Sequence, residues 1–177
     1  DGKNVITISV KAENGDVRTY KVEVVREEND GTVDNTPSVL TSSVYNVNQD
    51  TMLITGIDKL PITAEELKRN VQSSKGEQIL IQKEDGTTQT GAVGTGNKVL
   101  LVDEKGETKA VYAVIIYGDV NGDGNIYATD YRIIKNQIMG DKQLLFDLYA
   151  KAADVDRDGN VYATDYRRIK NHIMEVS

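Results

Sequence analysis

The sequence predicts a multi-domain protein with an N-terminal β-hairpin, a small α+β module of element order ββαβββ, and an all-α module of two loop–helix motifs. Three observations support this fold class. Apolar and polar residues alternate on both sides of an Asn-Gly pair near the N-terminus. Strand-like runs surround one helix signal in the middle of the chain. The C-terminal third contains almost the same stretch twice, DVNGDGNIYATDYRIIKNQIM and DVDRDGNVYATDYRRIKNHIM.

The composition argues against several classes of function. The 177 residues contain no cysteine, so neither disulfides nor thiolate chemistry are available. No stretch is long and apolar enough to span a bilayer. The net charge of -7 and the pI near 4.8 argue against a nucleic-acid partner, because phosphate binding needs clustered Lys and Arg. Much of the acidity is therefore available to bind cations.

An N-terminal hairpin is predicted at residues 1–26. Apolar and polar residues alternate from Ile6 to Val10, Asn14 and Gly15 provide a tight turn, and a second alternating run follows. Two strands alone are marginal in water, so we expect the remnant of a β-sandwich domain. The hairpin resembles the last two strands of the cadherin-like repeats of bacterial surface proteins. Because the chain begins inside a strand without a leader, we expect a fragment whose targeting signal lies upstream.

A linker is predicted at residues 27–42, which are polar, rich in turn formers and without periodicity. The α+β module is predicted at residues 43–117. Within it, Thr63 and Glu66 form a capping box that predicts one short helix at residues 63–72. The predicted strands are residues 45–47, 52–57, 77–84, 98–103 and 108–117.

The α+β module carries no catalytic constellation in its sequence. It has no His and no Cys, and its acidic residues occur mainly in turns such as Asp85-Gly86. We therefore predict that the chain is not an enzyme and that this module is a structural companion of its neighbour.

Two loops in the repeated stretch carry oxygen-bearing side chains at a fixed spacing. In DVNGDGNIYATD such side chains stand at positions 1, 3, 5 and 12 with glycine at 6, and DVDRDGNVYATD repeats the pattern. This is the spacing of the EF-hand calcium loop, in which position 7 adds a backbone carbonyl. Oxygen-only ligands favour a hard cation, and a flexible loop with several carboxylates favours Ca²⁺ over Mg²⁺. The predicted ligands of two Ca²⁺ ions are Asp119, Asn121, Asp123, Asn125, Asp130, Asp154, Asp156, Asp158, Asn160 and Asp165.

A helix with distinct faces is predicted after each loop. Apolar residues such as Ile134 and its counterpart Ile169 are expected to form the core. A second stripe is identical in both copies, as are loop positions 10 and 11, although neither set binds metal through side chains. A face kept in duplicate indicates a partner surface, although a recent duplication would leave the same identity. The predicted partner-binding residues are Ala128, Thr129, Arg132, Lys135, Asn136, Met139, Ala163, Thr164, Arg167, Lys170, Asn171 and Met174.

The first loop lacks the entering helix of an EF-hand. The residues before Asp119, AVYAVIIYG, form a predicted strand, and a helical link is predicted at residues 141–152, with apolar Leu144, Leu145 and Leu148. A loop followed by one helix, duplicated in this way over residues 118–177, resembles the dockerin module of cellulosomal proteins. The module directly before it resembles the X-modules that often precede dockerins.

The resemblance implies a calcium-dependent docking module that binds a cohesin domain of a scaffold or cell-surface protein. It further implies an extracellular location, secreted or attached to the cell surface, in the setting of polysaccharide degradation. In dockerins, loop positions 10 and 11 and two residues further along the following helix contact the cohesin, which here are Ala128-Thr129 and Lys135-Asn136. Because this set is present twice, the resemblance implies docking in either of two opposite orientations.

Two other functions remain open at this stage. An EF-hand-type calcium sensor opens a Met-rich groove when filled and has paired helices around each loop, one of which is missing here. A carbohydrate-binding accessory module needs an aromatic platform, for which the middle module shows no pattern. Because a disulfide-free C-terminal segment of this size has a thin core, bound calcium is expected to supply much of its stability.

Overall fold

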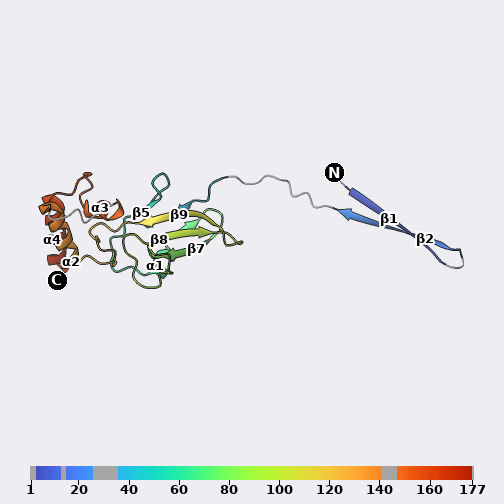
Figure 1. Cartoon of the computed structure of the whole chain (residues 1–177), viewed down its shortest axis with the longest axis horizontal. Coiled ribbons are helices and arrows are strands. Elements are labelled where there is room, and N and C mark those ends of the chain that lie inside the picture. The colour runs from blue at the N-terminus through green and yellow to red at the C-terminus, as the bar shows by residue number, and fades with distance from the viewer. Residues whose placement is uncertain (1–2, 13–14, 26–35, 141–146, 177) are drawn as a thin grey trace. The chain divides into compact units, whose positions relative to one another are not determined.

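The computed structural model describes residues 3–12, 15–25, 36–140 and 147–176 of the chain (Figure 1). The chain forms two compact units, Asp1–Thr36 and Pro37–Ser177. Among the described residues, no helix has both the length and the apolar character needed to cross a membrane.

The first unit is a hairpin of antiparallel strands β1 (Lys3–Lys11) and β2 (Val17–Val25). Gly15 in the turn has a φ of +94°, which glycine adopts without strain, and its N–H donates to the Ala12 carbonyl at 2.9 Å. Asn14 of the predicted turn lies outside the described residues. Every side chain whose burial is described here, at positions 7–12 and 15–21, is exposed. These residues therefore contribute to no buried core.

The strands of the second unit are β3 (Leu40–Thr41), β4 (Asn46–Asn48), β5 (Leu53–Thr55), β6 (Gln72–Ser73), β7 (Gln78–Gln82), β8 (Lys98–Val102) and β9 (Thr108–Val114). Five of them form one sheet of order β4-β5-β9-β8-β7. Neighbouring strands are antiparallel except β5 and β9, which are parallel. Short strands β3 and β6 pair separately. Helix α1 (Ala64–Arg69) begins after Thr63, whose hydroxyl accepts a hydrogen bond from Glu66 N, one half of the predicted capping box.

A first core lies between the sheet and α1. Leu67 of α1 packs there with Ile54 of β5 and Tyr112 of β9, and all three are fully buried. The Tyr112 hydroxyl accepts a hydrogen bond from Leu40 N at 3.0 Å, so the polar end of this buried ring is satisfied. Burying each of the aliphatic side chains contributes about 2 kcal/mol of stability.

Three helices follow the sheet and gather at one of its ends (Figure 1). They are α2 (Ala128–Met139), α3 (Asp147–Ala153) and α4 (Ala163–Val176). Ile134 of α2 and Ile169 of α4 are buried in a second core, as their spacing predicts.

The predicted link at residues 141–152 is described only from residue 147 onward, where α3 begins. Leu148 is half-buried and packs against the second core. Leu144 and Leu145, also predicted to lie in this link, fall outside the described residues.

The predicted fold class is wrong in its C-terminal part. The sequence predicts a separate all-α module, whereas Pro37–Ser177 is one compact unit of mixed α/β structure with sheets and four helices among its described residues. Ile115, directly after β9, is buried in the core of the helices, and Leu53 of β5 packs against the same core. Helical periodicity identifies these helices, but it does not reveal that they share a core with strands distant in sequence. The domain boundaries proposed after residues 26, 42 and 117 stay predictions.

Candidate functional site

The first repeated loop, residues 119–130, begins with a fully buried aspartate. The Asp119 carboxylate accepts hydrogen bonds from Gly122 N at 2.8 Å and Gly124 N at 3.1 Å, so the loop is folded around its first predicted ligand. Burial, with a smaller contribution from the nearby charge of Asp130, raises the pKa of this carboxyl to about 6 against the opposing effect of the backbone hydrogen bonds. A cation at this position would favour the charged form and offset both effects.

Asp130, at position 12, closes the first loop. Its carboxylate is buried and accepts hydrogen bonds from Val120 N at 3.0 Å, Asn121 N at 3.3 Å and Tyr127 N at 2.9 Å. Tyr127 immediately precedes α2, so the predicted position-12 ligand also satisfies a free N–H at the start of this helix. Burial raises the pKa of Asp130, and the charge of Asp123 raises it further.

The remaining predicted ligands of the first loop lie nearer the surface. Asn121 and Asp123 are exposed and Asn125 is half-buried. The Asn121 side-chain amide donates to Asp123 Oδ2 at 2.8 Å, and Asn125 N donates to Asp123 Oδ1 at 2.9 Å. Gly124 at position 6 has a φ of +84°, the conformation that the sharp turn of the calcium loop requires.

The second loop, residues 154–165, gathers its acidic side chains closely. One carboxylate oxygen from each of Asp154, Asp156 and Asp158 lies within 4.8 Å of the others. Asp154 accepts hydrogen bonds from Asp158 N at 3.0 Å and Gly159 N at 2.8 Å. Three carboxylates this close repel one another, and a divalent cation among them removes the repulsion.

The second loop closes as the first does. Asp165 is buried, and its carboxylate accepts hydrogen bonds from Asp156 N at 3.1 Å and Tyr162 N at 2.9 Å. Asn160, the predicted ligand at position 7, is exposed, and its N–H donates to Asp158 Oδ1 at 2.9 Å. Both loops thus offer only oxygen donors, several of them carboxylates, which fits calcium. Position 12 is aspartate rather than glutamate in both, so each loop must close further to reach an ion with both oxygens.

One support of the first loop has no counterpart in the sequence prediction. Thr95 N donates to Asp119 Oδ2 at 2.9 Å, although Thr95 belongs to the segment between β7 and β8. In the sequence, Gly94-Thr95-Gly96 shows only the turn formers that separate two predicted strands. Two glycines on either side of a threonine were the one available signal of a close backbone approach.

The predicted partner surface lies on α2 and α4. Tyr131 of α2 stacks on Tyr166 of α4 with ring centroids 4.3 Å apart. The predicted partner-binding residues are all exposed except Asn136, which is half-buried. Met139 and Met174 are 65% and 67% exposed, large values for apolar side chains. A hollow of about 230 Å³ opens beside Met139, lined mainly by apolar atoms.

Two exposed tyrosines extend this surface. Tyr127 and Tyr162, at loop position 9 of the two copies, are each 57% exposed and directly precede the predicted contact residues Ala128 and Ala163. Neither tyrosine is among the predicted partner-binding residues. Their identity in both copies was the signal that could have identified them.

Residues 117–174 match the family model of the dockerin type I domain. The matched segment contains both loops and ends within α4. Dockerin type I domains are non-catalytic modules that dock on cohesin domains in a calcium-dependent manner, and they typically occur in extracellular proteins. Searches of curated proteins and of solved structures give no match to this chain. The X-module-like and cadherin-like resemblances therefore stay predictions.

Proposed function

We propose that the dockerin region of this chain binds two calcium ions and docks on a cohesin domain of a scaffold or cell-surface protein outside the cell. The α+β region predicted at residues 43–117, called the sheet region below, acts as its structural companion, in the manner of an X-module. The observation that carries the proposal is the duplication of a complete set of oxygen donors, each next to the same exposed set of side chains. The proposed calcium ligands are Asp119, Asn121, Asp123, Asn125 and Asp130 in the first loop, and Asp154, Asp156, Asp158, Asn160 and Asp165 in the second.

The proposed role of calcium is structural. Bound cations would neutralise carboxylates that the chain holds within a few ångströms of one another, and binding energy at such a site is also folding energy. Asp130 and Asp165 connect each loop to the first turn of the following helix through the N–H groups of Tyr127 and Tyr162. Closure of a loop therefore fixes the start of the helix that carries the proposed partner surface.

The proposed partner surface combines positive charge with apolar anchors. Each copy offers an arginine, a lysine, an asparagine and a methionine on the helix, and Ala-Thr at loop positions 10 and 11. Such a surface fits a cohesin face with acidic groups around an apolar centre, because rim charges steer association while buried anchors provide most of the affinity.

Capture by immobilised cohesin domains tests the proposal. The full chain should bind at least one member of a panel of cohesin domains in millimolar calcium and should be released by EGTA. A carbohydrate-binding module would instead be retained by a polysaccharide column, and a calcium sensor would bind amphipathic helical peptides. Failure to bind any cohesin with both ions in place would refute the docking proposal while leaving the calcium sites intact.

A further inference from the structure

The loop between β7 and β8 is joined to the segment that leads into the first calcium loop. Thr95 and Asp119 are both buried, and Thr95 N donates to Asp119 Oδ2 at 2.9 Å. The Thr95 hydroxyl donates to the Ile116 carbonyl at 3.2 Å and accepts from Ile116 N at 3.0 Å. Three hydrogen bonds thus hold this threonine against the residues just before and at the first predicted ligand.

The two backbones approach so closely that only glycine fits. A Cβ atom on Gly94 would lie 2.2 Å from the Gly122 carbonyl oxygen. A Cβ atom on Gly122 would lie 2.8 Å from the Thr95 carbonyl oxygen, and one on Gly124 would lie 2.7 Å from the Val93 carbonyl oxygen. Real Cβ atoms essentially never come within 3.0 Å of such atoms. The contact is therefore one between backbones, and any side chain there would separate them.

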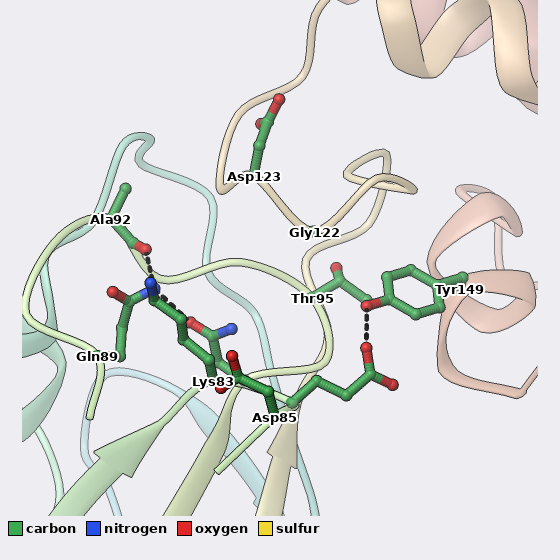
Figure 2. Close-up of a pocket in the computed structure, with 10 residues that line it drawn as sticks. Lys83, Asp85, Gln89, Ala92, Thr95, Gly122, Asp123 and Tyr149 are labelled. Carbon is green, nitrogen blue, oxygen red and sulfur yellow. Dashed lines mark hydrogen bonds between the residues drawn. The ribbon is translucent and has the colours of Figure 1, made fainter. Parts of the chain in front are cut away.

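Helix α3 braces the same junction. The Tyr149 hydroxyl donates to Glu84 Oε2 at 3.0 Å, and a Cβ atom on Gly96 would lie 2.7 Å from that hydroxyl oxygen. Figure 2 shows Tyr149, Thr95 and Gly122 around one pocket, which has a volume of about 610 Å³. The loop between β7 and β8, the first calcium loop and helix α3 thus meet at this pocket.

The second loop provides an internal comparison, because it has the same pattern without this support. Asp154 is only half-buried, and the hydrogen bonds described to its carboxylate come from Asp158 N and Gly159 N of its own loop. Arg157 stands where the first loop has Gly122 and is accommodated there at a φ of +64°. A Cβ atom on Gly159 would meet nothing within 4 Å. The crowding by the sheet region explains why position 4 of the first loop is glycine, whereas the exposed position 4 of the second loop has room for arginine.

We infer that Thr95 is a positioning residue of the first calcium site, and that the Gly94–Thr95–Gly96 loop holds Asp119 in its binding position before an ion arrives. This inference rests on the proposed calcium binding. It makes the two sites different in kind, although their loops are nearly identical. The first site depends on the folded sheet region and is organised in advance, whereas the described hydrogen bonds to Asp154 of the second site come from its own loop. The contact of the second loop with Tyr117 is made by Arg157 and not by a predicted ligand. Orienting contacts of this type typically change metal affinity by about 10- to 100-fold.

A matched pair of glycine substitutions tests the inference. Gly94→Ala forces the two backbones apart, whereas Gly91→Ala in the same loop meets only the Gln89 side chain, at 3.8 Å. Each substitution is made in the full chain in two backgrounds: Asp165→Asn, which leaves the first site, and Asp130→Asn, which leaves the second. Calorimetric titration with CaCl₂ should show affinity about tenfold lower for Gly94→Ala in the Asp165→Asn background, and a change within about twofold in the other three combinations.

Two further measurements separate a positioning role from a general loss of structure. In calcium-free buffer, amide hydrogen exchange at Thr95 should be slow in the unaltered chain and faster in Gly94→Ala, while exchange at Tyr112 in the sheet is unchanged. Thr95→Val keeps the shape and the N–H but removes both hydroxyl hydrogen bonds, so it should weaken the first site by a smaller factor.

The outcomes distinguish this inference from the proposed calcium binding on which it rests. An unaltered chain that binds no calcium would refute both. If the unaltered chain binds calcium at both sites, equal affinity of the first site in folded Gly94→Ala and Gly91→Ala would refute only the positioning role. Equal weakening of both sites by Gly94→Ala would also refute it, because the effect would then be a general one.

Discussion

The ring of Tyr131 lies on the ring of Tyr166, with centroids 4.3 Å apart and planes 24° from parallel, and their hydroxyl groups are hydrogen-bonded. These residues occupy the same position in the two sequence repeats, 35 residues apart. A contact between equivalent residues is what a local two-fold relationship between α2 and α4 produces. We therefore expect the two copies of the proposed partner surface to be related by the same pseudo-symmetry.

Pseudo-symmetry predicts that the two copies of the surface substitute for one another. Replacing Lys135 and Asn136 by Ala should leave cohesin affinity within about twofold, because the other copy still offers a complete surface, and the same holds for Lys170 and Asn171. The variant with all four substitutions should lose at least about tenfold in affinity, since neither copy then has its lysine and asparagine. Surface plasmon resonance on a cohesin that binds the unaltered chain measures this. Loss of binding by one double variant alone would show that a single orientation is used.

Calcium removal should destabilise the C-terminal helices. In the second loop three carboxylates lie within 4.8 Å of one another, and without a cation they repel. At a free calcium concentration about a thousandfold above Kd, each ion adds about 4 kcal/mol to the free energy of unfolding. Differential scanning calorimetry in calcium and in EGTA should therefore show a large fall in Tm. An unchanged Tm would contradict the structural role of the ions.

Each loop should lose its ion independently when its closing carboxylate is neutralised. Asp130→Asn and Asp165→Asn replace one carboxylate oxygen by an amide, which cannot ligate calcium in a bidentate manner. We expect a stoichiometry of about one ion per chain for either variant, measured by calorimetric titration. A stoichiometry of two in either variant would show that the closing residue is not a ligand.

The proximity of Asp119 and Asp130 in the candidate site was predictable, because the spacing of an EF-hand-type loop is local. Asp119 and Asp130 lie in one loop, and their positions in the sequence suffice to bring them together. Thr95 was not predictable, since its contact with Asp119 joins residues 24 apart along the chain. The fold class failed for the same reason, because Ile115 and Leu53 connect the sheet to the helices through contacts between distant segments.

The hydroxyl contact between the stacked rings should contribute to stability by itself. Tyr131→Phe keeps the stacking but leaves the Tyr166 hydroxyl without this partner. Because the rings are only half-buried and water can replace the lost bond in part, we expect a small fall in the free energy of unfolding that exceeds the change in the control variant. Urea denaturation in saturating calcium measures the change. Tyr127→Phe is the matched control, since that ring is exposed and should change stability by less than about 0.5 kcal/mol.

The Glu77 carboxylate should make the stability of the unit Pro37–Ser177 depend on pH. The hydroxyl groups of Ser38 and Ser73 donate to it, as does Lys75 N at 3.3 Å. These contacts, that of Ser38 first, lower the pKa of Glu77 from 4.5 to about 2. A lowered pKa means that the stabilisation is complete above pH 4.5 and is lost as the pH falls toward 2.

Glu77→Gln tests this dependence. The substitution removes the charge while keeping the shape, so at pH 7 the free energy of unfolding should fall by on the order of 1 kcal/mol, a value reduced by solvent screening at this partly exposed position. The difference from the unaltered chain should then shrink as the pH falls through the window between the two pKa values, because protonated glutamic acid and glutamine become equivalent acceptors. Urea denaturation of both proteins at a series of pH values measures it. Both proteins share the titration of the two carboxylate loops, so the difference between their free energies of unfolding cancels it. A difference that stays constant down to pH 2 would assign the effect of the substitution to packing rather than to charge.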